Sequence, residues 1–231
     1  MTDDLLELYF NASNDIYRMT RVTTSSAWTT PMAVAELSSG SVETTPEVTA
    51  DGLVMVLSSE RAGGLGGTEL WISTRATRTA AWGTPAVMTG LNWSGADASG
   101  VMSTDRLSIA LTSDRVGGTM SDIFLSERVA VGAAWSTPIP TPALNTPSHE
   151  GSAFLGGNKL LICFDSNRTA DLELYCAERA TASDPFGAPQ PLPAPINSPS
   201  SNEEDPWLSP DGRHIVFTSS RAPSGLWEAF R

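Results

Sequence analysis

The hydrophobic residues of this chain gather in short runs instead of recurring at helical spacing. Typical runs cover residues 53–57, 160–164 and 215–217, and each is rich in Val, Ile, Leu or Phe and bounded by turn-forming residues. Their residues are apolar at consecutive positions, which predicts strands that are covered on both faces. No stretch keeps a 3.6-residue period, so the pattern predicts an all-β protein.

Aromatic and charged markers around these runs repeat along almost the whole chain. Trp28, Trp82, Trp135 and Phe186 follow one another at intervals of 54, 53 and 51 residues, and each precedes a proline by three residues. An arginine recurs with the same period, as Arg21, Arg75, Arg128, Arg179 and Arg231. Four short strands in each repeat of about 50 residues are typical of a propeller blade. We therefore predict a β-propeller of about five four-stranded antiparallel blades.

The ends of the chain predict that blade one and blade five are incomplete. The chain opens in the second strand of a blade at Leu5 and stops after a third strand at Arg231, which gives eighteen strands in all. We expect a single domain over 1–231, with repeats at approximately 1–36, 37–90, 91–143, 144–195 and 196–231. Blade five would pack on blade one to close the ring; a fragment of a larger propeller is the alternative.

The last repeat carries a family resemblance. Its segment 205–221, which reads DPWLSPDGRHIVFTSSR, closely resembles the signature of TolB-type, WD-like propeller repeats. The other repeats match more loosely, because Ser-Pro-Asp-Gly becomes Thr-Ala-Asp-Gly, Ser-Thr-Asp-Arg and Gly-Gly-Asn-Lys. The resemblance implies an interaction scaffold or an accessory domain of a larger protein.

Two rows of charged residues fall on one predicted rim, where the d–a and b–c loops of the blades lie. The carboxylates are Glu43, Asp97, Glu150 and Glu203, and each precedes by 18 residues one of the arginines Arg61, Arg115, Arg168 and Arg221. Because the rows occur in nearly every repeat, we interpret them first as ion pairs and loop caps. The functional alternative is a polar ring at the channel mouth that binds an anion or a peptide carboxylate, with Glu150, Arg115 and Arg168 among its members.

Single residues add fewer candidates. Trp93 and His149 have no counterpart in the other repeats and lie on the same rim, so they are candidate ligand-binding residues. Trp93 could equally cover its own loop, and His149 could be a solvated loop residue. Asp51, Asp105 and Asp211 are expected to form tight turns on the opposite face, since their side chains accept hydrogen bonds from nearby backbone. No pattern of metal ligands is present in the sequence.

The composition narrows the partners. A net charge of −12 repels phosphate backbones and anionic lipid, so we expect no nucleic-acid binding and no membrane insertion. The N-terminus has no signal-peptide pattern, which predicts a cytoplasmic protein or a domain excised from an exported one. A monomer is expected. Cys163 and Cys176 are expected to be two small buried side chains in adjacent strands, with a cross-strand disulfide as the alternative.

Catalytic motifs of the common hydrolase, nucleotide-binding and zinc families are missing from the sequence. We therefore expect a non-catalytic β-propeller, without cofactor, that binds a protein or peptide through the rim carrying the d–a and b–c loops. The alternative functions are a five-bladed carbohydrate-binding or glycoside-hydrolase-like propeller and an accessory domain of a larger enzyme.

Overall fold

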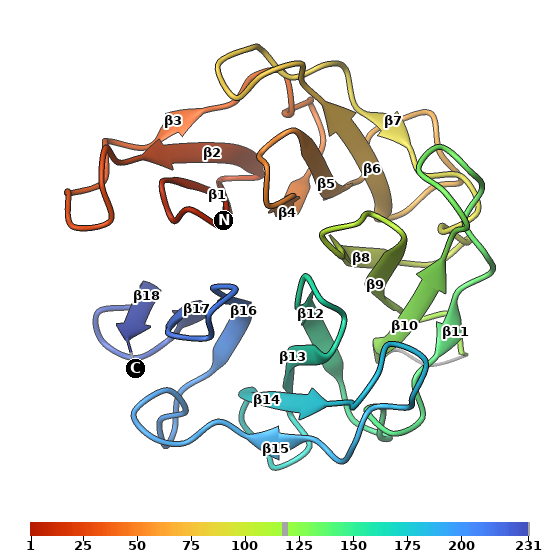
Figure 1. The fold of residues 1–231 in the computed structure, drawn as a ribbon, viewed down its shortest axis with the longest axis vertical. Coiled ribbons are helices and arrows are strands. Elements are labelled where there is room, and N and C mark those ends of the chain that lie inside the picture. Colours follow the sequence, from red (N-terminus) through yellow and green to blue (C-terminus); the bar gives the residue numbers. More distant parts are fainter. Residues whose placement is uncertain (117–119, 231) are drawn as a thin grey trace. The chain divides into compact units, whose positions relative to one another are not determined.

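The computed structural model describes residues 1–116 and 120–230, so Arg231 of the repeated arginines lies outside the described residues. These residues contain eighteen strands and no helix. The strands form five antiparallel sheets, in each of which neighbouring strands follow the chain order (Figure 1). Within the described ranges, no helix has the length and apolar character needed to cross a membrane.

The three central sheets have four strands each, and the first and last have three. The first sheet contains β1 (Glu7–Ala12), β2 (Asp15–Thr20) and β3 (Met32–Ala33). The second contains β4 (Glu43–Val48), β5 (Val54–Ser59), β6 (Glu69–Thr74) and β7 (Ala86–Val87). The third contains β8 (Asp97–Met102), β9 (Ser108–Ser113), β10 (Asp122–Glu127) and β11 (Ile139–Pro140). The fourth contains β12 (Glu150–Leu155), β13 (Leu161–Ser166), β14 (Glu173–Glu178) and β15 (Gln190–Pro191). The fifth contains β16 (Glu203–Leu208), β17 (His214–Ser219) and β18 (Gly225–Phe230).

The fold class is therefore a β-propeller of five blades, and the predicted shortening of blades one and five is confirmed. The apolar runs are the second strands of the blades. All six residues of β5 are buried, as its lack of alternation predicted, and so are all six residues of β9. The fourth strands are only two residues long and start just after the repeated prolines.

By compactness the chain divides into two units, Met1–Gly100 and Val101–Arg231. In the first unit, Ile16, Leu37, Met55 and Leu57 lie at the centre of a core that includes Trp71 and Trp82. In the second, Leu174, Ile215 and Phe217 form a core cluster between blades four and five. The expected single domain over 1–231 stays a prediction.

The first turn of the chain corrects one boundary. Leu5 was expected in a strand, but it lies in the turn before β1, with a φ of 63°. Asp4 accepts hydrogen bonds there from the Thr2 hydroxyl (2.7 Å) and the Leu6 N–H (3.1 Å). Asp51 accepts the equivalent hydrogen bonds before β5, from the Thr49 hydroxyl and the Leu53 N–H, and Gly52 in that turn has a φ of 73°. Blade one therefore keeps the turn that precedes a second strand, without glycine at the left-handed position.

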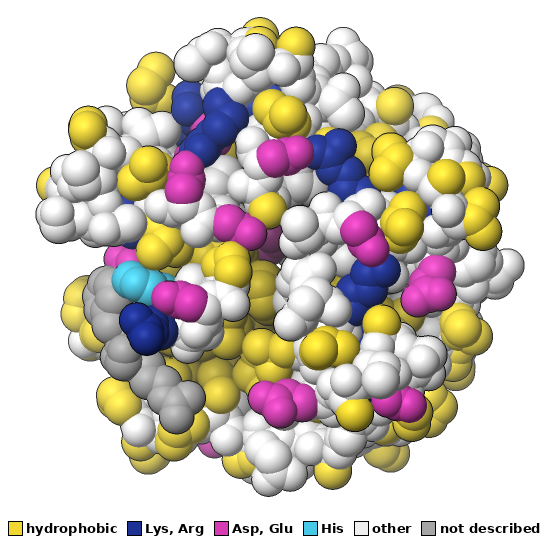
Figure 2. All heavy atoms as spheres, viewed as in Figure 1, with side chains coloured by type: hydrophobic (Ala, Val, Ile, Leu, Met, Phe, Trp, Pro, Cys, Tyr) yellow, Lys and Arg dark blue, Asp and Glu magenta, His cyan; other side chains and the backbone are white. Residues whose placement is uncertain are grey.

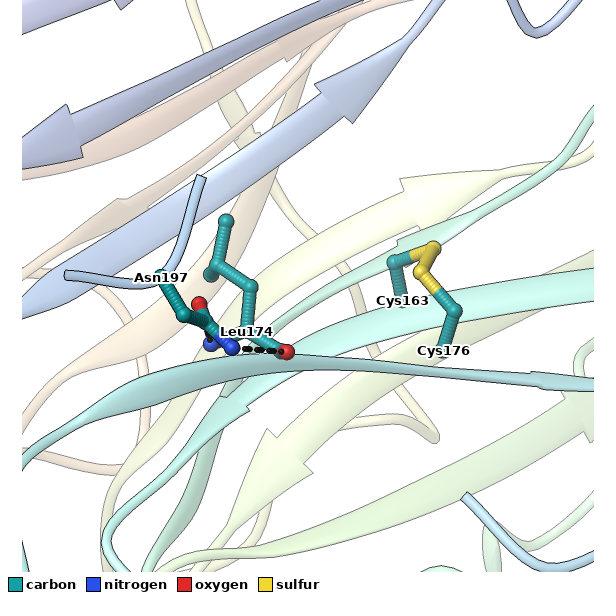
Figure 3. Close-up of a disulfide and its surroundings, with 4 residues drawn as sticks. All are labelled: Cys163, Leu174, Cys176 and Asn197. Atoms are coloured by element: carbon teal, nitrogen blue, oxygen red, sulfur yellow. Dashed lines mark hydrogen bonds between the residues drawn. A yellow bond between two sulfur atoms is a disulfide. The ribbon is translucent and has the colours of Figure 1, made fainter. Parts of the chain in front are cut away.

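The cysteines are the second correction. Cys163 of β13 and Cys176 of β14 are direct cross-strand partners, with their Cα atoms 4.1 Å apart, and they form a disulfide (Figure 3). The expectation of adjacent strands is confirmed, but that of two separate thiols is wrong. Close by in the same view, the side-chain amide of Asn197 holds both backbone groups of Leu174, at 2.9 and 3.0 Å.

Candidate functional site

The row of carboxylates predicted on the rim is buried and held inside the blades. Glu43, Glu150 and Glu203 are fully buried. Each forms an ion pair with the arginine 18 residues later, and the distances from Nη2 of the arginine to Oε1 of the glutamate are 3.3, 3.1 and 2.9 Å. The Glu150 carboxylate also accepts hydrogen bonds from the Thr146 N–H (2.8 Å) and the Ser166 hydroxyl (2.9 Å). These carboxylates have their hydrogen-bonding capacity filled, which fits the structural interpretation of the row.

The paired arginines are equally engaged. Arg168 donates from Nε to the Ser166 hydroxyl (3.0 Å) and from Nη2 to the Leu144 carbonyl (2.7 Å), and its guanidinium lies 4.7 Å from the centre of the Tyr175 ring. Arg115 donates to the Ser113 hydroxyl at 2.9 Å and lies over Phe124 at 5.0 Å. Arg61 and Arg221 repeat the contact with serine, at 2.9 and 2.8 Å. Arg61, Arg168 and Arg221 also donate to the carbonyls of Leu37, Leu144 and Ile196, so each of these three ties the b–c turn of its blade to the loop that enters the blade.

The aspartates of the opposite face are turn residues. Asp105 and Asp211 accept hydrogen bonds from Ser103 and Ser209 two residues earlier, both at 2.6 Å. Asp105 also pairs with Lys159 of the next blade at 2.7 Å. Burial alone would raise the pKa of Asp105, but Lys159 and the hydroxyl outweigh it and lower this pKa to about 2. Such contacts stabilise the ionised form and the turn together.

Trp93 belongs to the first compact unit, where its ring is partly buried. Its backbone N–H donates to Asp97 at 2.7 Å. Ser39, the equivalent residue of blade two, makes the same contact with Glu43, also at 2.7 Å. The backbone role of this position is therefore repeated, and only the side chain of Trp93 is singular. A ligand-binding role for it stays a prediction.

His149 lies in the second unit, beside acidic side chains that the sequence analysis did not select. Asp165 is the fifth residue of β13, and Glu204 and Asp205 are the second and third residues of β16. The strands β12 and β16 lie against each other, so that blades four and five bring these residues together (Figure 1). We call Asp165, Glu204 and Asp205, with His149 at their edge, the carboxylate cluster.

The contact between His149 and Asp165 depends on a glycine. The ring Nε2 of His149 lies 3.4 Å from Oδ2 of Asp165. A Cβ atom on Gly151 would lie 2.4 Å from that Nε2 and 2.7 Å from that Oδ2. The missing side chain therefore makes the room in which histidine and carboxylate meet. Asn167 positions His149, because its side-chain oxygen accepts a hydrogen bond from the backbone N–H of His149 at 3.0 Å.

The electrostatics of the carboxylate cluster favour added positive charge. Burial, followed by the charge of Asp165, raises the pKa values of Glu204 and Asp205. The interaction with Asp165 raises the pKa of His149. Solvent reaches the side chain of Asp205, although protein atoms surround it on most sides. Thr218 donates its hydroxyl to Asp205 at 3.3 Å. Mutual repulsion of carboxylates is relieved by a proton or by a cation.

One atom of the cluster lacks a donor. Asp165 is 1% exposed, and its Oδ1 atom is buried without a hydrogen-bond partner in the described structure. A buried carboxylate oxygen left in this state is costly, by roughly 1–3 kcal/mol or more. The described residues hold no group of three His, Cys, Asp or Glu side chains placed to share a metal ion. The cluster thus concentrates negative charge, which a positively charged ligand with several N–H donors would neutralise.

A comparison of the blades by strand position would have found this cluster. The residues equivalent to Asp165 are Asn11, Ser58, Thr112 and Thr218. Those equivalent to the pair Glu204–Asp205 are Thr44–Thr45, Ala98–Ser99 and Gly151–Ser152. An acidic residue occurs at these places only in blades four and five. The signal is hidden in the sequence because it requires the strand register to be known.

Comparisons with known proteins agree with the fold. No protein-family model matches this sequence, and no curated protein matches it. Among solved structures, TolB from Acinetobacter baumannii is similar with a TM-score of 0.56 and 16% identity, over 100% of this chain and 53% of that one. A TolB-type protein from Agrobacterium tumefaciens gives 0.61 and 17%, over 96% of this chain and 68% of that one.

An enzyme is also among the similar structures. The endo-arabinase from Bacteroides thetaiotaomicron has a TM-score of 0.64 and 12% identity, over 97% of this chain and 88% of that one. The chain spans about half the length of the Acinetobacter TolB. At such identities the likeness shows the fold alone, and the similar structures include both TolB propellers and glycoside hydrolases. The chain is a five-bladed β-propeller, and its fold is similar to that of these proteins.

Proposed function

We propose that the protein is a non-catalytic binding module that accepts a basic side chain of a peptide or protein partner in the carboxylate cluster. The observation that carries this proposal is the group of three carboxylates in which the buried Asp165 lies beside Glu204 and Asp205 of β16, whose side chains solvent reaches. A guanidinium offers five N–H donors in a planar fork and remains charged at any physiological pH. It would pair with Glu204 and Asp205, which solvent reaches, and neutralise the repulsion among Asp165, Glu204 and Asp205.

The charge of the whole chain agrees with a basic partner but does not select the site. The net charge is −12, which attracts cationic partners over a distance of about a Debye length. On the face drawn in Figure 2, however, acidic and basic side chains are interspersed. Local geometry must therefore select the docking point, and the carboxylate cluster supplies it next to the predicted rim residue His149.

The test is equilibrium binding of a fluorescent tri-arginine peptide to the full chain. We expect the double variant Glu204→Gln, Asp205→Asn to weaken binding at least about tenfold, since each charge-assisted hydrogen bond contributes roughly 1.5–3 kcal/mol. The matched control is Asp171→Asn, Glu178→Gln, which removes two charges from exposed positions of the same unit. Equal weakening in both variants would mean that only net charge matters and would refute the site.

A glycoside hydrolase is the second candidate, and the raised pKa values favour it. A carboxyl group with a raised pKa beside an ionised one is the arrangement of a glycosidase acid and its partner. Glu43, Glu150 and Glu203 are taken up by their arginines, which leaves Asp165, Glu204 and Asp205 as the acids to test. Release of nitrophenol from aryl arabinosides, abolished by Asp205→Asn, would support the enzyme and contradict a purely binding role.

A further inference from the structure

The first compact unit contains a pocket of about 350 Å³ between blade one and blade two. It lies between β2–β3 of blade one and the segment 75–82 that follows β6, and neither the rim rows nor the carboxylate cluster takes part in it. The lining includes Tyr9, Arg18, Met32, Arg75, Ala80 and Trp82. A volume near 350 Å³ is at the lower end for small-molecule sites.

Three guanidinium groups, two of them from the lining, converge on one buried carboxylate beneath the pocket. Glu7 is 1% exposed and pairs with Arg18, with Arg75 at 2.7 Å and with Arg78 at 3.4 Å. Asp4 forms a second ion pair with Arg78. Three cations thus face two carboxylates, which leaves one positive charge in excess. Glu36 also lines the pocket but is exposed, where water screens its charge.

Arg18 is the cation with free donors. Its side chain is 38% exposed and lines the pocket, and its Nε atom faces Glu7. The Nη atoms of Arg18 make no hydrogen bond with any residue that the structure describes. Arg75 is occupied instead: it donates to the Gly52 carbonyl at 2.6 Å and to Glu7, and it lies 4.4 Å from the Trp82 ring centre. The two Nη atoms of Arg18 are therefore the hydrogen-bond donors that a ligand can reach.

The position of these residues in the blade argues against a purely architectural role. Tyr9 and Arg18 are cross-strand partners in blade one. The partners at the same register are Val56–Ile72 in blade two, Ala110–Leu125 in blade three, Cys163–Cys176 in blade four and Val216–Glu228 in blade five. Blades two to four thus fill this place with small or apolar pairs, blade five has one acidic member, and a basic side chain occurs here in blade one alone among the five pairs. Blade one replaces the apolar pair by a phenol and a guanidinium, and places Glu7 beneath them.

The hydrogen bonds make the polar floor rigid. The Trp82 indole N–H donates to the Tyr9 hydroxyl at 3.2 Å, and that hydroxyl donates to Glu7 at 3.0 Å. The two rings meet edge to face with centroids 5.9 Å apart. Burial, together with the charge of Glu7, raises the pKa of Tyr9 to about 12, so the phenol keeps its proton. A floor fixed in this way presents Arg18 without a large loss of side-chain freedom on binding.

We propose that this pocket binds a small organic anion, a carboxylate attached to an apolar group, with the carboxylate on the Arg18 fork. Planar bidentate pairing with a carboxylate is the contact that a guanidinium makes best. The apolar group would lie against Trp82, Ala80 and Met32, the last of which is 71% exposed at the pocket. A free small acid and the C-terminal carboxylate of a chain share this chemistry.

The experiment is calorimetric titration of the full chain with two pairs of probes. Benzoate and N-acetylphenylalanine carry the carboxylate, and benzamide and N-acetylphenylalaninamide are their neutral counterparts. We expect both carboxylates to bind and both amides to bind at least about tenfold more weakly. Tighter binding of N-acetylphenylalanine would identify a chain terminus as the source, and tighter binding of benzoate a free acid. Equal binding of acids and amides, or binding of neither acid, would overturn the proposal.

Three variants separate the site from general effects. Arg18→Gln should weaken both acids at least tenfold, and Arg18→Lys, which keeps the charge beside Glu7 but loses the fork, should weaken them several-fold. Ala80→Trp should block the pocket without changing its charge. Arg213→Gln removes an exposed arginine of blade five and should leave both affinities unchanged. Full affinity in Arg18→Gln or in Ala80→Trp would contradict this pocket as the binding site.

Discussion

At the scale of the residue, the molecule separates groups that recur in the blades from groups that occur once. Buried Glu–Arg pairs recur and have their partners inside the blade, as with Glu43 and Arg61. Asp165 and Asp205 interrupt the pattern, and they are the groups whose surroundings lack donors or oppose their charge. The proposed function therefore rests on acidic residues that occur once, at strand positions that are neutral in the other blades.

Asp205→Asn should stabilise the protein at neutral pH. The pKa of Asp205 is raised on folding, so its ionised form opposes folding once the pH exceeds the ordinary carboxyl pKa. Water reaches this side chain and reduces the effect, to about 1 kcal/mol or less, which corresponds to roughly 2–4 °C in melting temperature. Thermal unfolding at pH 7 and pH 3 checks the sign: the gain should vanish at pH 3, where both states are protonated.

The control for that prediction is Asp211→Asn, in the same blade. Hydrogen bonds from Ser209 and from the Arg213 N–H lower the pKa of Asp211, so its ionised form favours folding. This variant should lose stability at pH 7, and the loss should shrink only as the pH falls through the lowered pKa of Asp211. A gain in Asp211→Asn, or a loss in Asp205→Asn, would reverse the electrostatic assignment of the two aspartates.

Gly52→Ala should destabilise the first unit, whereas Gly40→Ala should not. Gly52 has a φ of 73°, and an added Cβ would lie 3.2 Å from Nη2 of Arg75. A left-handed L-residue costs about 1–2 kcal/mol. Gly40 has nothing within 4 Å of an added Cβ, so alanine there should be neutral or slightly stabilising. Urea midpoints measure both, and equal midpoints for the two variants would rule out strain at Gly52.

At the scale of the element, each blade is fastened by the same few contacts. Nε of Arg75 donates to the Gly52 carbonyl at 2.6 Å, and Nε of Arg179 donates to the Lys159 carbonyl at 2.7 Å. Both guanidiniums lie 4.4 Å from an aromatic ring centre, of Trp82 and Phe186 respectively. This contact explains why the repeated arginine and the repeated aromatic residue keep a constant spacing: each needs the other to close the blade.

Arg168→Gln should lower the free energy of unfolding by about 3 kcal/mol, and the melting temperature by about 6–12 °C. The change leaves the buried Glu150 carboxylate without its ion pair and the Leu144 carbonyl without its donor. Denaturant unfolding measures the loss. The exposed Arg213→Gln should change stability by about 0.5 kcal/mol at most. Similar losses in the two variants would show that the pair does not stabilise blade four.

Reduction of the disulfide should destabilise the protein by about 3 kcal/mol, because the bridge closes a loop across a sequence separation of 13 residues. The urea midpoint with and without dithiothreitol measures this effect. Cys163→Val, Cys176→Ile reproduces the pair that blade two holds at this register and should be insensitive to the reductant. An unchanged wild-type midpoint, or two free thiols before reduction, would contradict the bridge.

At the scale of the whole molecule, the repeat predicted the blades and their incomplete ends, because every blade needs the same turn, aromatic and arginine residues. The functional candidates were harder to predict. His149 was selected as a singular residue, but Asp165 and Glu204 are 39 residues apart in sequence and meet only because β13 and β16 lie against each other. The Tyr9–Arg18 pair was missed for the same reason, since it requires the register of β1 and β2.

The most direct test of the proposed function is a crystal structure of the full chain soaked with saturating tri-arginine peptide. The proposal predicts a guanidinium within hydrogen-bonding distance of the carboxylates of Glu204 and Asp205. His149 should keep its contact with Asp165. A peptide bound at another surface, with the carboxylate cluster unoccupied, would contradict the proposed function.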